Sequence, residues 1–283
     1  MSLRWIIFSC FFTFCMAEPT WDTLRVTWGM NILSSINFAK MPLTIGETSG
    51  KGFRKLPGEC SGGKFYGHRY IKGQDSAIVL IYDSKGYVAG IQTGIPAYFI
   101  KQMNTDYPYS KTPSFQLDKI DDEDVYFLTA YFVDPQTICK SERSHDEFEK
   151  NIGNGLWFQN GINPLESSLK VPLYEKNVTD KKWTKGGCYR TMGQHYWYNL
   201  SEDMDCDKFF PFFLMYNREK LTGFGFALLG NFQFTSRYEH PNKDSLSRFL
   251  DPVPKCLNKE YDKAGGFTSL HVYFTVRPWN LFC

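Results

Sequence analysis

The sequence predicts a strand-rich α+β protein made of two similar, disulfide-stapled lobes that pack as one compact body. The main observation is an internal repeat: residues 76–90, SAIVLIYDSKGYVAG, correspond to residues 212–226, FFLMYNREKLTGFGF. Aromatic residues make up 17% of the 283 residues, a composition that favours strands. Self-similarity on this scale is typical of a duplicated supersecondary unit, so the repeat sets the expected architecture.

Each copy of the repeat predicts a β-hairpin, because two apolar runs flank a short polar turn. The expected strands are Ala77–Tyr82 with Tyr87–Thr93, and Phe212–Tyr216 with Leu221–Leu229.

A proline follows each hairpin and predicts the first turn of a short helix. The helices are expected at residues 97–103 and 242–250, the closing aromatic strands at 125–133 and 269–276, and one more helix at 141–150. From Pro96 to Cys139 is 43 residues and from Pro241 to Cys283 is 42, a near-equality that was not used to align the copies.

The repeat divides the chain into an arm, two lobes and a connector, which follow an apolar leader. Arg4 precedes an apolar run that ends at Ala17, and this pattern predicts a secretory signal peptide too short to span a bilayer. We expect no membrane span further along the chain. The predicted segments are the signal peptide (1–17), the N-terminal arm (18–57), the first lobe (58–139), the connector (140–185) and the second lobe (186–283).

The cysteines predict three disulfide bonds in the mature chain. Cleavage of the signal removes two cysteines and leaves six, which allow fifteen pairings by spacing alone. If both lobes fold alike, each has a bridge from its start to its closing strand, and the two remaining cysteines pair with each other. The expected pairs are Cys60–Cys139, Cys188–Cys283 and Cys206–Cys256.

Secretion also makes two glycosylation sequons usable, at Asn177 and Asn199. The 32 Lys and Arg nearly balance the 30 Asp and Glu, so the chain has no basic field to hold nucleic acid or an anionic membrane. The expected partner is an extracellular ligand or protein.

The candidate ligand site by composition is the segment 195–198, in which an imidazole adjoins two phenols and an indole. Its members are His195, Tyr196, Trp197 and Tyr198. A strand that sends alternate residues into the core, with histidine bonded to a backbone carbonyl, explains the same segment without a functional role.

The candidates for acid–base catalysis are four histidines: His195, His68, His240 and His271. They offer no local ligand pair such as two histidines at i and i+4, so no metal is predicted and no cofactor is implied.

Two other short motifs resemble known functional sites but lack residues or elements that those sites require. Asp203, Asp205 and Asp207 alternate as in a calcium loop, but position six is Lys208 and position twelve is Leu214, which excludes an EF-hand. Residues 58–62, GECSG, resemble a nucleophile elbow but lack the flanking strand and helix, so a disulfide-bonded cysteine is expected there.

These observations favour a secreted, non-catalytic binding protein for an extracellular ligand or partner. The alternative is a secreted enzyme, metal-dependent or using histidine as acid and base, with its site around the four histidines. A structural matrix component would carry low-complexity or strongly charged tracts, and the sequence has none.

Overall fold

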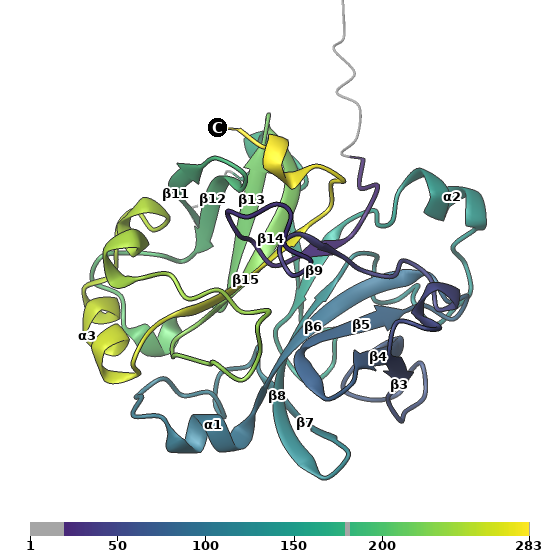
Figure 1. Cartoon of the computed structure of the whole chain (residues 1–283), viewed down its shortest axis with the longest axis horizontal. Coiled ribbons are helices and arrows are strands. Elements are labelled where there is room, and N and C mark those ends of the chain that lie inside the picture. The colour runs from purple at the N-terminus through teal and green to yellow at the C-terminus, as the bar shows by residue number, and fades with distance from the viewer. Residues whose placement is uncertain (1–19, 179–181, 283) are drawn as a thin grey trace, which may run out of the picture.

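The computed structural model describes residues 20–178 and 182–282, and it consists mainly of antiparallel strands in two sheets (Figure 1). The predicted strand-rich α+β class is confirmed. The predicted signal peptide, Thr179 of one sequon and Cys283 lie outside the described residues. Within the described part of the chain, no helix is long and apolar enough to cross a membrane.

Sheet 1 contains the hairpin predicted in the first half of the chain. Its strand order is β10-β9-β8-β6-β5-β4-β3, and β7 pairs with β8 as well. The bounds are β3 (Phe53–Lys55), β4 (His68–Lys72), β5 (Asp75–Tyr82), β6 (Val88–Pro96), β7 (Gln116–Ile120), β8 (Glu123–Tyr131), β9 (Leu156–Gln159) and β10 (Ser168–Val171). The last two strands come from the segment predicted as the connector, and they extend this sheet.

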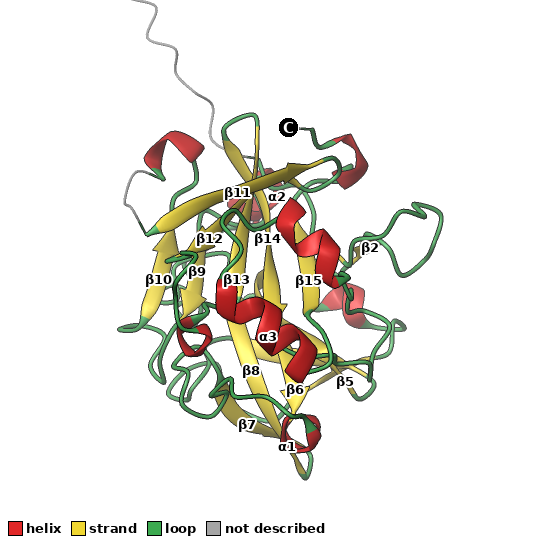
Figure 2. Ribbon diagram, turned by 90° about the vertical axis from the view of Figure 1, so that its left-hand side faces the viewer, coloured by secondary structure: helices red, strands yellow, loops and turns green. Residues whose placement is uncertain are grey.

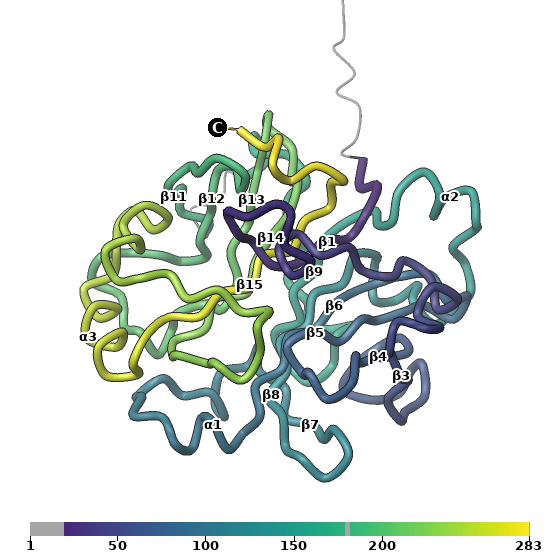
Figure 3. The backbone as a smooth tube through the Cα atoms, in the orientation of Figure 1, coloured from purple at the N-terminus to yellow at the C-terminus, as the bar shows by residue number. Residues whose placement is uncertain are grey.

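Sheet 2 contains the second predicted hairpin. Its strand order is β11-β12-β13-β14-β15-β1-β2, so two short strands of the N-terminal arm complete it. The bounds are β1 (Arg25–Val26), β2 (Ala39–Lys40), β11 (Trp183–Tyr189), β12 (Gly193–Tyr198), β13 (Phe212–Asn217), β14 (Lys220–Leu228) and β15 (Thr268–Tyr273). After β2 the arm continues to β3, so it joins an edge strand of sheet 2 to an edge strand of sheet 1 (Figure 3).

The two sheets share one aromatic core. Phe158 of β9 stacks on Phe212 of β13 with ring centroids 4.2 Å apart, and Phe132 meets Phe274 edge to face at 5.0 Å. Trp21 stacks on Phe274 at 4.0 Å, and its indole nitrogen donates to a backbone oxygen. Each such side chain contributes about 2–3 kcal/mol by leaving water, so the sheets are held as a single body.

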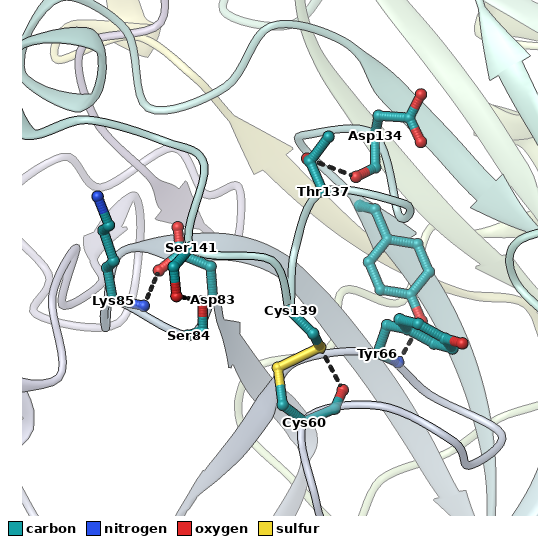
Figure 4. The surroundings of a disulfide bond; sticks show 10 residues. Cys60, Tyr66, Asp83, Ser84, Lys85, Asp134, Thr137, Cys139 and Ser141 are labelled. Atoms are coloured by element: carbon teal, nitrogen blue, oxygen red, sulfur yellow. Dashed lines mark hydrogen bonds between the residues drawn. A yellow bond between two sulfur atoms is a disulfide. The ribbon is translucent and has the colours of Figure 1, made fainter.

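The outer face of sheet 1 is covered by loops that a disulfide bond ties together (Figure 4). Cys60 precedes β4 and Cys139 follows β8, and their bond closes a separation of 79 residues. Tyr131 belongs to the apolar cluster against which Cys139 packs, and its hydroxyl accepts a hydrogen bond from the backbone nitrogen of Tyr66. This disulfide confirms one predicted pair.

The disulfide Cys206–Cys256 is also present, as predicted, with a separation of 50 residues. The third predicted pair includes Cys283, outside the described residues, and stays a prediction.

The helices are few and short. α1 (Ala97–Gln102) follows Pro96 as predicted. The helix expected at 141–150 is shorter, α2 (His145–Lys150), because a capping box of Ser144 and Glu147 sets its start. The segment expected as a helix at 242–250 forms the 3-10 helix η4 (Lys243–Arg248), and α3 (Lys255–Lys263) was not predicted. The other 3-10 helices are η1 (Gly46–Thr48), η2 (Glu175–Asn177), η3 (Cys206–Lys208) and η5 (Pro278–Asn280).

Candidate functional site

A cavity of about 430 Å³ lies against the outer face of sheet 2, on the side away from sheet 1. Figure 2 shows this face, with α3 in front of it. The segment from Glu239 to Leu250, which includes η4, forms the opposite wall, and Trp28 and Met30 of the N-terminal arm border it. Six aromatic side chains line the cavity: Trp28, Tyr189, Trp197, Phe213, Phe249 and Phe267. The site is therefore mainly apolar.

The register of sheet 2 sets the floor of the cavity. Trp197, Phe213, Gly225 and His271 are consecutive partners across β12, β13, β14 and β15. A Cβ atom on Gly225 would lie 2.0 Å from the ring of Phe213. Because this position has no side chain, the Phe213 ring lies over the strand and contacts His271, with centroids 5.0 Å apart.

Strand alternation separates the four residues predicted to bind ligand. His195 and Trp197 line the cavity, whereas Tyr196 and Tyr198 point to the other face of β12. The hydroxyl of Tyr196 donates to Glu175 at 2.8 Å.

A carboxylate and an imidazole form a buried pair in the wall. Nδ1 of His271 donates to Oε2 of Glu239 at 2.5 Å, and the hydroxyl of Ser269 donates to the same oxygen at 2.8 Å. The backbone nitrogen atoms of Trp28 and His271 donate to Oε1 at 2.5 and 3.2 Å. Burial alone would raise the pKa of Glu239, but His271 and these hydrogen bonds outweigh it and hold the pKa below its usual range. The carboxylate is therefore ionised at neutral pH.

The pair leaves one nitrogen atom without a hydrogen bond. His271 is only 6% exposed, and its Nε2 atom is buried and has no hydrogen-bond partner among the described residues. Since an ionised carboxylate can only accept, Nδ1 of His271 is the donor to Glu239, and Nε2 is the ring atom left to bond to a ligand. A polar group of a ligand would satisfy this atom.

His195 is a second buried imidazole in the same wall. Its Nδ1 atom donates to the backbone oxygen of Gly187 at 3.1 Å, and its ring lies 5.4 Å from Phe213 and 5.3 Å from Phe249. Burial, with a smaller effect of His271, lowers the pKa of His195 from 6.5 to about 3. His195 is therefore neutral at physiological pH and adds to the apolar lining.

The structure brings together three of the four predicted catalytic histidines. His195 and His271 have ring centroids 6.2 Å apart, and His240 lines the same cavity. Burial lowers the pKa of His240, and its Nδ1 atom lies 3.4 Å from the hydroxyl of Thr268. His68 lies on β4 of sheet 1, away from this group.

The other two motifs, around Cys60 and around Asp203 to Asp207, form a disulfide bond and surface ion pairs. Cys60 is disulfide-bonded, Asp203 pairs with Lys255, and Asp205 pairs with Lys208. Within residues 20–178 and 182–282, no group of three or more His, Cys, Asp or Glu side chains is placed to hold a metal ion.

Sequence reasoning missed Glu239 and Trp28 as site residues. Glu239 directly precedes His240 in the sequence, and this neighbour of a candidate histidine could have indicated a role at the site. No feature of the sequence around Trp28 predicts a binding site there, because Trp28 reaches the cavity only through the pairing of β1 with β15.

Comparisons with protein families, with curated proteins and with solved structures found no significant match to this chain.

Proposed function

We propose that this chain is a secreted, disulfide-bonded glycoprotein that acts as a non-catalytic binding protein, with its ligand site in the cavity of sheet 2. The observation that carries the proposal is the make-up of this cavity: aromatic walls around a few convergent polar groups, the usual composition of a small-molecule site. The unsatisfied Nε2 atom of His271 adds to it, because a buried polar atom without a partner costs about 1–3 kcal/mol.

Three features support the extracellular setting. The first 17 residues have the pattern of a signal peptide. Two disulfide bonds are typical of an oxidising compartment. Asn177 and Asn199 are both exposed, as glycan attachment requires.

The binding function is tested with the uncharged dye N-phenyl-1-naphthylamine, whose fluorescence rises in an apolar pocket. We expect the wild-type protein to bind it and Ser245→Trp to bind at least about tenfold more weakly, because Ser245 lines the cavity and the indole would fill it. Ser247→Trp is the matched control, since Ser247 is exposed on the same 3-10 helix and does not line the cavity. Equal binding by both variants would contradict the proposed site.

A second candidate function is an enzyme that uses His271 as a general base. The specific observation is the short hydrogen bond from His271 to Glu239, which orients the ring and leaves Nε2 without a partner on the cavity side. We expect His271→Asn to abolish any turnover, because an amide keeps the hydrogen bond to Glu239 but supplies no base at the Nε2 position. Turnover that persists in this variant would exclude the catalytic role.

We also propose that the two halves of the chain arose by duplication. Strands β4-β5-β6-β8 and β12-β13-β14-β15 follow the same order. Each run starts at a glycine with positive φ, Gly67 at 94° and Gly193 at 93°, a conformation that side chains rarely adopt. The β5–β6 and β13–β14 hairpins each shift register at a tyrosine, Tyr82 or Tyr216, whose hydroxyl donates to a proline carbonyl.

Duplicated units should have equivalent disulfide bonds. Peptide mapping of the unreduced protein is therefore expected to find Cys188 bonded to Cys283, the counterpart of Cys60–Cys139. A bridge from Cys188 to any other cysteine would contradict the duplication.

A further inference from the structure

We infer that a second cavity of this chain binds a small soluble molecule through a phosphate group of that molecule. The cavity has a volume of about 370 Å³ and shares no lining residue with the cavity of sheet 2. It is lined by the N-terminal arm, by β4 and β5 of sheet 1, and by the segment between β14 and β15. Three features carry the inference: the clustering of cations, their lack of carboxylate partners, and the fixed position of Arg237.

Positive charge is concentrated in the lining of this cavity. The cationic side chains of the lining are Lys40 on β2, Lys51 after η1, Lys72 at the end of β4, and Arg237. Over the whole chain the 32 Lys and Arg nearly balance the 30 Asp and Glu, so this excess is a local one. A cleft lined by one sign of charge focuses the field and attracts a counter-ion.

Most of these cations have no anionic partner in the protein. Within the described part of the chain, no carboxylate lies within ion-pair distance of Lys40, Lys72 or Arg237. Lys51 does have a partner, because its ammonium group lies 3.6 Å from Glu47. Three cationic side chains are therefore available to a ligand.

The carboxylate of the lining, Asp75, does not neutralise these cations. One of its oxygen atoms accepts a hydrogen bond from the backbone nitrogen of Ala77 at 3.1 Å, and the other accepts from the hydroxyl of Thr235 at 2.8 Å. These two donors hold the carboxylate beyond ion-pair distance of the lysines and of Arg237.

Arg237 is held in position by hydrogen bonds of its own backbone. Its backbone nitrogen donates to the hydroxyl of Thr235 at 3.1 Å, and its backbone oxygen accepts from the hydroxyl of Thr27 at 2.9 Å. The Nη1 atom of its guanidinium group is buried and has no hydrogen-bond partner among the described residues. A guanidinium group with unused donors binds an oxyanion through paired hydrogen bonds.

Charge and size favour a phosphate group over a carboxylate. The three unpaired cations exceed the charge of Asp75 by two, and a phosphate ester carries a charge of about −1.5 to −2 at pH 7 with three strong acceptor oxygens. A carboxylate offers one charge and two oxygens. The volume of the cavity lies within the range of about 300–1,000 Å³ that is usual for small-molecule sites.

The inference is tested by calorimetry on the wild-type protein with glycerol 3-phosphate, glycerate and glycerol, at constant ionic strength and in a buffer without phosphate. We expect glycerol 3-phosphate to bind at least about tenfold more tightly than glycerate, and glycerol to give no binding signal. Glycerate that binds as tightly as glycerol 3-phosphate, or glycerol 3-phosphate that does not bind, would overturn the inference.

A second arm distinguishes a soluble phosphate ester from a lipid headgroup. Vesicles of equal parts phosphatidylcholine and phosphatidic acid present the same phosphate group on a surface. We expect them to sediment no more protein than vesicles of phosphatidylcholine alone, because the chain as a whole is nearly neutral and its cations lie around a cavity. Sedimentation with the phosphatidic acid vesicles, without binding of glycerol 3-phosphate, would overturn the soluble ligand.

Two variants test the residues. Arg237→Gln and Lys72→Gln each remove one unpaired cation, so we expect glycerol 3-phosphate to bind at least about tenfold more weakly to either. Lys111→Gln is the matched control, because Lys111 is exposed, does not line the cavity, and pairs with no carboxylate of the described chain. Lys72 is exposed as well, so its variant should fold, and unchanged affinity in Lys72→Gln would contradict the assignment.

The two cavities are tested separately. Binding of N-phenyl-1-naphthylamine should be the same in Lys72→Gln as in the wild type, because Lys72 does not line the cavity of sheet 2. Glycerol 3-phosphate that displaces the dye would contradict a second site. If the dye fails to bind but glycerol 3-phosphate binds, the proposed ligand site in sheet 2 is wrong and the phosphate site is supported.

Discussion

Acidification should destabilise this protein through His195, and the size of the effect follows from its burial. The pKa of His195 is about 3 in the folded chain and 6.5 in the unfolded chain. Between these values the unfolded state binds one more proton, so the free energy of unfolding falls by about 1.4 kcal/mol for each unit of pH decrease. From pH 7 to pH 5 this single side chain accounts for a loss of about 2 kcal/mol.

The perturbation that isolates this effect is His195→Asn. The amide nitrogen of asparagine can replace Nδ1 as donor to the carbonyl of Gly187, and the amide does not titrate in this range. The variant also loses the packing of the ring and so differs from the wild type in absolute stability, and the quantity compared is therefore the slope of unfolding free energy against pH.

The assay is urea denaturation at intervals from pH 4 to pH 7. We expect the slope between pH 4 and 6 to be smaller in His195→Asn by about 1.4 kcal/mol per pH unit. His145→Asn serves as the control, because the side chain of His145 is 62% exposed. Parallel curves for the wild type and His195→Asn would refute the neutral, buried state of His195.

Two further predictions concern packing and covalent bonds. Gly225→Ala should lower the free energy of unfolding by about 1–3 kcal/mol, because the added Cβ overlaps the ring of Phe213, whereas Gly63→Ala, with open space around it, should change it by less than about 0.5 kcal/mol in the same urea assay. Replacing Cys206 and Cys256 together by serine should cost about 4 kcal/mol, the chain-entropy value for a loop of 50 residues, and an unchanged urea midpoint would contradict this.

The features that sequence predicted well are local ones. The two hairpins followed from turn chemistry: Asp83 accepts hydrogen bonds from the backbone nitrogen atoms of Lys85 and Tyr87, and Gly86 takes the positive φ that the turn needs. The Cys60–Cys139 bond followed from the repeat, and the Cys206–Cys256 bond followed by elimination of the other cysteines. Neither inference required knowledge of distant contacts.

The cavity could be predicted only in part, because its walls come from distant parts of the chain. The segment around His195 was a candidate by composition, but alternation along β12 sends only His195 and Trp197 into the cavity. Glu239 faces His271 only because Glu239 and Ser269 form an isolated bridge between segments 30 residues apart. A single amino-acid sequence gives no indication that two such distant segments pair.

The central claim, that a ligand occupies the cavity at His271, is tested most directly by nitrogen-15 NMR of the protein with labelled histidines. On titration with N-phenyl-1-naphthylamine, we predict a shift of the Nε2 signal of His271, a smaller change at His195, and none at His145 or His68. Saturating dye that leaves His271 unchanged, or that shifts His68 instead, would contradict the account.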